Sequence, residues 1–142
     1  MFDNFNSQNI QETTNLILER IVSETGALAA FLVDESGFLI DEAGDIEIDR
    51  VSLSALVSAT FGATAEVARI LGEPDFSKLT HQGSSRHLFI GRVGGKHILT
   101  IVFDSDTNLG LVKLYAEEFS KKLADVLADD FSQEEISDKN AL

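Results

Sequence analysis

Three histidines offer the most obvious chemistry in this sequence, because imidazole serves both as a metal ligand and as a general base. His81, His87 and His97 lie in three successive segments of the second half of the chain. His81 and His87 flank one predicted turn, where their rings could approach each other. No cysteine and no HxH or HExxH spacing accompanies them. A third metal ligand is therefore missing, and ordinary strand histidines are the favoured interpretation.

Nucleophiles and paired acids are no better organised. No serine stands in a GxSxG elbow, and the acid pairs Asp34–Glu35, Asp41–Glu42 and Asp104–Asp106 fall at predicted turns, where solvated carboxylates are expected. None of them matches a calcium-binding loop. The chain has no GxxxxGK[ST] motif, and no helix follows the glycines of segment 91–95. We therefore expect no metal, no cofactor, no bound nucleotide and no catalytic residue in this chain.

Composition narrows the class of protein further. The 142 residues carry a net charge of −13, with 24 acidic residues against 11 basic ones, and contain no cysteine. An acidic surface repels phosphate backbones and anionic lipids, so nucleic-acid and membrane-surface roles are disfavoured. The charge suits either solubility, which is the commoner reason, or a basic protein partner. The amino terminus lacks the pattern of a signal peptide, and no apolar run approaches a membrane-spanning length. We expect a cytoplasmic protein without membrane insertion.

Apolar periodicity and turn residues predict eight elements in the order αββαβββα. This order indicates an α/β (α+β) fold in which a five-stranded antiparallel sheet lies between helices. Strands 27–33 and 96–104 are continuously apolar and should be central, whereas the polar strand 76–82 should be an edge. We expect one domain over 7–128 and an acidic, flexible tail over 129–142. The predicted helices are 7–25, 49–71 and 109–128, and the predicted strands are 27–33, 38–43, 76–82, 86–93 and 96–104.

The helix at 49–71 is the most informative element. Asp49 can cap its start, Gly72 can end it, and Pro74 prevents its continuation. We expect one stripe to pack on the sheet, formed by Leu53, Leu56, Val57, Phe61, Thr64, Val67 and Leu71. The other face carries unusually small side chains, at Ala55, Ser58, Ala59, Gly62 and Ala65, together with Arg69. Solvent-facing helix surfaces normally carry Glu, Lys and Gln, and a glycine inside a helix costs about 1 kcal/mol relative to alanine. We interpret this face as a protein interface.

Three stretches of the sequence resemble the roadblock (dynein light chain) domain family, and within it the MglB group of bacterial polarity regulators. They are segments 24–38, 63–83 and 102–114, of which His81-Gln82-Gly83 and Leu109–Leu114 are the most specific. The resemblance spans roughly residues 9–127. The acidic tail lies outside it, and Phe61 is bulkier than expected, although its phase on the helix places it on the core side.

The resemblance implies a homodimer joined along an edge strand and the second helix, on which a Ras-like small GTPase of the MglA type docks and has its GTP hydrolysis stimulated. It implies a function in cell polarity or gliding motility and no catalytic residue in this chain. The alternative is a roadblock scaffold that binds a GTPase or a motor component without changing hydrolysis. The partner-binding residues implied by the resemblance are Ala55, Ser58, Ala59, Gly62, Ala65, Glu66 and Arg69.

Overall fold

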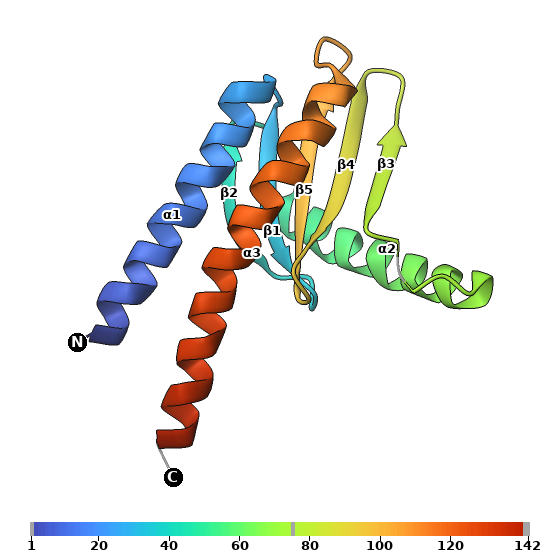
Figure 1. The fold of residues 1–142 in the computed structure, drawn as a ribbon. Helices are drawn as coiled ribbons and strands as arrows, with labels where there is room; N and C mark the ends of the chain where they lie inside the picture. The colour runs from blue at the N-terminus through green and yellow to red at the C-terminus, as the bar shows by residue number, and fades with distance from the viewer. Residues whose placement is uncertain (1, 75, 141–142) are drawn as a thin grey trace.

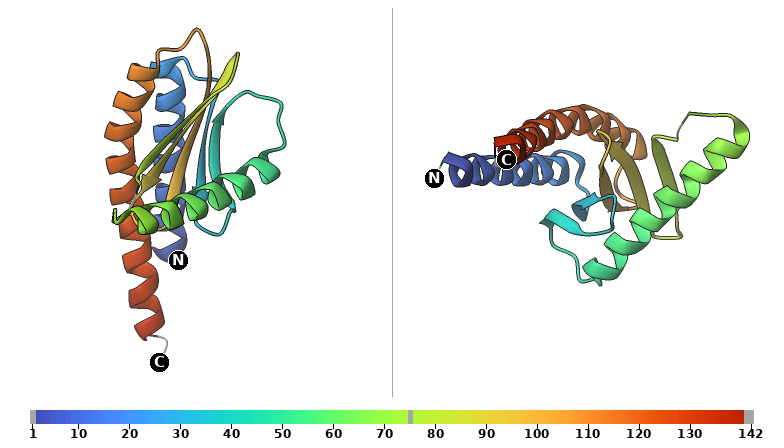
Figure 2. Two further views of the ribbon diagram at one scale, coloured as in Figure 1. Left: turned by 90° about the vertical axis from the view of Figure 1, so that its right-hand side faces the viewer. Right: turned by 90° about the horizontal axis from the view of Figure 1, so that it is seen from below.

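The computed structural model describes the backbone of residues 2–74 and 76–140, and the side chains of residues 8–74 and 76–128. Within these residues, three helices and five strands follow one another in the predicted order. Figures 1 and 2 show the sheet between two helical layers, with α1 and α3 side by side on one face and α2 on the other. The helices are α1 (Phe2–Thr25), α2 (Arg50–Leu71) and α3 (Leu109–Asn140), and the strands are β1 (Ala29–Asp34), β2 (Leu39–Gly44), β3 (Lys78–Gln82), β4 (Arg86–Val93) and β5 (His97–Asp104).

The strand order of the sheet confirms the sequence prediction. The strands are antiparallel and lie in the order β2–β1–β5–β4–β3. The two continuously apolar strands, β1 and β5, are interior and buried over nearly their whole length. A strand covered on both faces must be apolar throughout, which is why composition predicted their positions. The polar strand β3 is an edge, as expected.

The sheet face under α1 and α3 holds the larger core. The apolar sides of both helices pack against it, and the side-chain cations of Arg20 and Lys122 lie over the ring of Phe119, at 5.2 and 5.1 Å from the ring centre. Fully buried side chains of this core include Leu18, Ile21, Phe89, Leu99, Phe119 and Leu123. The opposite face, under α2, has a smaller core that includes Phe31, Val57, Phe61, Ile90 and Ile98.

Both ends of α2 are set by local chemistry that the sequence predicted. The carboxylate of Asp49 accepts hydrogen bonds from the Ser52 backbone N–H at 3.1 Å and from the Ser52 hydroxyl at 2.7 Å. These bonds lower the pKa of Asp49 below its ordinary value of 3.8. At the other end Gly72 adopts a left-handed conformation with φ 76°, in which its N–H and that of Glu73 bind carbonyls of the last turn. Glycine reaches this conformation without strain.

The predicted sheet-facing stripe of α2 is only partly correct. Val57 and Phe61 are buried, but Leu56 is 64% exposed, Val67 48% and Leu71 65%. Ser54 and Ala68, which the prediction left out, are buried instead. Two features explain the difference. First, α2 is rotated about its axis so that the smaller residues Ser54 and Ala68 face the sheet. Second, the carboxyl-terminal end of α2 runs past β3, where the sheet ends (Figures 1 and 2).

The outer helices are longer than predicted. We expected the last helix to end near Ala128, because its apolar stripe ends there, but α3 continues to Asn140. No glycine or proline occurs after Gly110, so nothing in the local sequence stops the helix. The side chains of segment 129–140 lie outside the described residues, as does the backbone of residues 141–142. Likewise α1 begins at Phe2 rather than near residue 7.

Candidate protein-interaction surface

The predicted partner-binding residues lie together along one side of α2, which we call the small-residue face. It is formed by Ala55, Ser58, Ala59, Gly62, Ala65, Glu66 and Arg69, all exposed except the partly buried Ser58. A Cβ atom placed on Gly62 would meet no atom within 4 Å outside its own helix. Gly62 therefore faces open space, and its small size is not required by the packing of the protomer.

The fold itself explains two members of this face. The turn between β1 and β2 rests against the first half of α2, where the Ser58 hydroxyl donates a 2.5 Å hydrogen bond to the Glu35 carbonyl. A Cβ atom on Gly37 would lie 3.2 Å from the Ala55 Cα atom. The contact is so close that only small side chains fit on either side. Ala55 and Ser58 are thus small because the β1–β2 turn packs against them. This contact does not explain why Ala59, Gly62 and Ala65 are small.

The charged end of the small-residue face carries an ion pair within the helix. The Arg69 guanidinium lies 3.0 Å from the Glu66 carboxylate, and both side chains are more than two-thirds exposed. An exposed pair of this kind contributes little to stability, because water screens it. Its two groups thus remain accessible to a partner.

A second exposed surface on α2 was missed by the sequence analysis. Leu56, Val67, Ile70 and Leu71 are exposed, and we call this set the apolar ridge. By length and composition alone, α2 is the one helix of the described residues that is apolar enough to cross a membrane. Its sequence is nonetheless interrupted by serines, threonines, Glu66 and Arg69, so it is not an unbroken apolar run. In the fold, however, α2 lies on the sheet through Val57 and Phe61. In the sequence, this second contact surface was indicated by apolar residues on every side of α2, since a helix with one contact surface is apolar on one side only.

Beside α2, the same face of the sheet has an apolar groove. The groove has a volume of about 450 Å³ and lies between the β2–α2 segment and the β3–β4 hairpin. Ile46, Ile48 and Leu53 form one side, and Leu88 and Val102 form its floor. α2 crosses the sheet near the β1–β2 turn and leaves this region uncovered (Figure 1).

The two edges of the sheet differ in their protection. At β2 the register shifts by one residue at Ile40, and the Asn15 side-chain amide of α1 donates to the Asp41 carboxylate at 3.1 Å and to the Glu42 carbonyl at 3.2 Å. A bulge and a covering helix are common ways of blocking an edge. At β3, by contrast, no strand of the described residues pairs with the outer edge. β3 is therefore the edge that is open to pairing.

The histidines do not form a site. In the β3–β4 register His81 lies opposite Leu88, and His87 lies opposite Gln82. Because successive residues of a strand point to opposite faces, the two rings are directed to different sides of the sheet. The His87 ring packs 5.3 Å from the Phe103 ring on the side of α1 and α3. The approach of the His81 and His87 rings that the sequence left possible is therefore not realised, in line with the favoured interpretation as ordinary strand histidines. Over the described residues, no group of three histidine or acidic side chains is placed to hold a metal ion.

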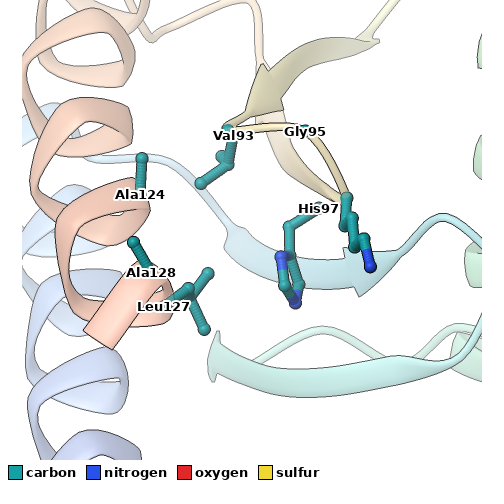
Figure 3. A pocket seen from close by; sticks show the side chains of 8 residues that line it. Val93, Gly95, His97, Ala124, Leu127 and Ala128 are labelled. Carbon is teal, nitrogen blue, oxygen red and sulfur yellow. The ribbon is translucent and has the colours of Figure 1, made fainter. Parts of the chain in front are cut away.

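A smaller cavity of about 250 Å³ separates α3 from the β4–β5 turn (Figure 3). Ala124, Leu127 and Ala128 of α3 face Val93 and His97 across it. Its walls are mostly carbon, and none of its eight lining residues is acidic. Small-molecule sites normally combine apolar walls with several converging polar groups, which this cavity lacks. The exposed surfaces of α2 and β3 are the stronger candidates for function.

Comparison with known proteins agrees with this geometry. The family model described as the Roadblock/LC7 domain matches residues 13–103. The gliding protein MglB of Thermus thermophilus has a similar structure, with 32% identity and a TM-score of 0.77 over 80% of this chain and 87% of that one. MglB of Myxococcus xanthus gives 33% identity and a TM-score of 0.78 over 81% and 94% of the two chains. An MglB structure with a tetrameric arrangement gives 31% and 0.78 over 80% and 87%. No curated protein sequence matches the chain.

Proposed function

The chain belongs to the Roadblock/LC7 domain family, and from this membership we propose that it is a cytoplasmic, homodimeric regulator that stimulates GTP hydrolysis by a bacterial Ras-like GTPase of the MglA type, in cell polarity or gliding motility. The observation that carries the proposal is the exposed side of α2. One helix presents both a small-residue face and an apolar ridge to solvent, opposite the sheet face that α1 and α3 cover. Exposed surfaces of this kind usually mark a contact with another protein, and in an isolated protomer both would stay exposed to water.

The apolar ridge, together with the open edge at β3, fits a second copy of the chain. Pairing of two β3 edges about a twofold axis would extend the sheet and place the two α2 helices on the same face, antiparallel to each other. The end of α2 that projects past β3 would then lie over the partner's sheet (Figure 2). Its exposed Val67 and Leu71 match the apolar groove that each protomer leaves uncovered. A symmetric interface of this kind buries ridge and groove twice.

Dimerisation is tested by Val67→Glu, with Leu114→Glu as the matched control. Both side chains are exposed in the protomer, but Leu114 lies on α3, on the other side of the sheet. A charge on the ridge would have to be desolvated in the dimer, so Val67→Glu should yield a folded monomer of 15.5 kDa in sedimentation equilibrium. The control should remain dimeric. A dimeric Val67→Glu variant would contradict the placement of α2 over the partner's groove.

The other surface, the small-residue face, is proposed to receive the GTPase. Ala59, Gly62 and Ala65 allow the backbone of a partner to approach α2 closely, and Glu66 and Arg69 add polar contacts at its end. Arg69 is the one arginine on this face, and it extends from a rigid helix with its guanidinium bound by Glu66. Arginine fingers act by reaching into the nucleotide pocket. The proposed mechanism is therefore indirect: docking favours a hydrolysis-competent arrangement of the GTPase's own residues.

Single-turnover hydrolysis decides between this function and its alternative. A Ras-like GTPase of the MglA type, loaded with GTP, is mixed with increasing amounts of the dimer, and phosphate release is followed. The expected result is a rate that rises and saturates. Binding without a change in rate would instead support the scaffold that joins a GTPase or motor component to another protein. Among the described residues, no arginine lies on a loop near this face. This is expected both of an indirect mechanism and of a scaffold that leaves hydrolysis unchanged. The rate measurement is therefore decisive.

A further inference from the structure

The turn between β1 and β2 presents an aromatic side chain to solvent. Phe38 is 69% exposed, and Val51, on the first turn of α2, is 77% exposed. These are among the most exposed apolar side chains of the described residues. Both lie beside the contact that joins the turn to α2, where Gly37 meets Ala55. The exposed apolar surface thus continues from the small-residue face onto the turn.

Hydrogen bonds hold this turn in one conformation. The Asp34 carboxylate accepts from the backbone N–H groups of Ser36, at 2.9 Å, and Phe38, at 3.0 Å. The Asp34 backbone N–H donates to the Phe38 carbonyl at 2.9 Å, and the Glu35 N–H donates to the Lys96 carbonyl at 2.9 Å. Because the backbone on both sides of Phe38 is already fixed, little backbone entropy is lost when a partner binds the ring. Rigid exposed aromatics with this property are typical anchors of protein interfaces.

The charges around this surface restrict the partner. Glu35 lies in the turn, and Glu47 and Asp49 precede α2, all three exposed. Two cations are near: Lys96 adjoins the turn through its carbonyl, and Arg50 at the start of α2 is paired with the Glu42 carboxylate at 2.7 Å. A second copy of the chain would bring the same acids into contact with each other, and an anionic membrane would be repelled, since the chain has a net charge of −13. The surface fits a protein that is apolar at the centre of its contact and rich in lysine and arginine at its rim.

We propose that the β1–β2 turn and the small-residue face of α2 form one composite docking surface for the GTPase, with Phe38 as its aromatic anchor and the surrounding acids pairing with a basic rim on the partner. This inference rests on the proposed function. The protomer then has two separate contact surfaces. β3 and the apolar ridge bind the second copy, and the turn and the small-residue face bind the GTPase.

Phe38→Ala is the direct test, with Leu114→Ala as a matched control that removes an exposed apolar side chain from α3. The probe is a Ras-like GTPase of the MglA type, loaded with a fluorescent non-hydrolysable GTP analogue and titrated with each full-length variant. Loss of an anchor side chain should weaken binding at least about tenfold, whereas the control should bind as the wild type does. Sedimentation should show that the Phe38→Ala variant remains a dimer. Glu35→Gln should weaken binding less, and the difference from wild type should shrink as salt is added.

Each alternative outcome has a separate meaning. If Phe38→Ala binds as tightly as the wild type while Gly62→Arg loses binding, the turn is not part of the surface, although the proposed function stands. If the wild type binds no such GTPase, the proposed function fails and this inference fails with it. Loss of the dimer in Phe38→Ala would assign the ring to the second copy and overturn the proposal. Flotation of the wild type, but not Phe38→Ala, with phosphatidylcholine vesicles would assign it to a membrane and overturn it equally.

Discussion

At Gly62, one substitution is expected to raise the stability of the protomer and to weaken its binding to the GTPase. The two properties can therefore be measured separately. Gly62 lies in the middle of α2 with an ordinary helical backbone and is not among the glycines with positive φ. A side chain at this position meets open space. Gly62→Ala and Gly62→Arg should therefore both be accommodated without strain.

The size of the effect follows from helix propensity. Alanine in a helix interior is about 1 kcal/mol more favourable than glycine, and arginine is only slightly less favourable than alanine. Both variants should raise the free energy of unfolding by about 0.5–1 kcal/mol. For a domain of this size that corresponds to roughly 2–4 °C in Tm. Binding should respond differently, since a methyl group occupies little of the space above Ala59 and Ala65, whereas an arginine side chain fills it.

The measurement combines urea unfolding with titration of the GTP-analogue-loaded GTPase. Unfolding is recorded at several protein concentrations, because dimerisation adds a concentration-dependent contribution to stability. We expect both variants to be stabilised, Gly62→Ala to keep most of the affinity and Gly62→Arg to lose it. If Gly62→Arg fails to fold, the orientation of α2 is wrong. If it folds and binds the GTPase as tightly as the wild type, the small-residue face is not the docking surface.

Three further predictions concern other parts of α2. Asp49→Ala should lower Tm at neutral pH. Hydrogen bonds from Ser52 lower the pKa of Asp49, so this cap stabilises the protein fully above pH 3.8 and loses its effect as the pH falls through the lowered pKa. The Tm values of the wild type and Asp49→Ala should therefore converge well below pH 3.8. Phe61→Ala should cost about 3–5 kcal/mol of unfolding free energy in urea titrations, because the ring is buried between α2 and the sheet; a loss below 1 kcal/mol would contradict that packing. Arg69→Lys keeps the charge but not the planar fork, so it should retain most of the stimulated hydrolysis at saturating protein, whereas a thousand-fold loss would make Arg69 an arginine finger.

The order of the elements could be predicted because it depends on neighbours along the chain. Unbroken apolar runs marked β1 and β5 as interior strands, since only a strand covered on both faces has that composition. Asp49 and Gly72 marked the ends of α2, because capping requires only residues within one turn. The end of α3 was misplaced for a related reason. The prediction followed the apolar stripe, but a helix can continue without one where no glycine or proline stops it.

The surfaces of the candidate site needed the tertiary structure. The apolar residues of α2 surround the helix, so periodicity alone does not tell which of them are buried. The choice depends on where the helix crosses the sheet, and because its end projects past β3, Val67 and Leu71 remain exposed. The contact of Gly37 with Ala55 joins segments far apart in the chain, so the sequence marked small residues without showing which of them the protomer itself requires.

The sequence by itself therefore determined the elements, their order, the interior strands and the helix with an unusual face, since short-range periodicity and capping specify all of these. The register of β3 against β4, which separates His81 from His87, was decided only in three dimensions. So was the phase of α2 against the sheet, which buries Phe61 and exposes Leu56. Register and phase depend on the sum of many long-range contacts, in which a shift by one residue or a fraction of a turn exchanges buried and exposed side chains.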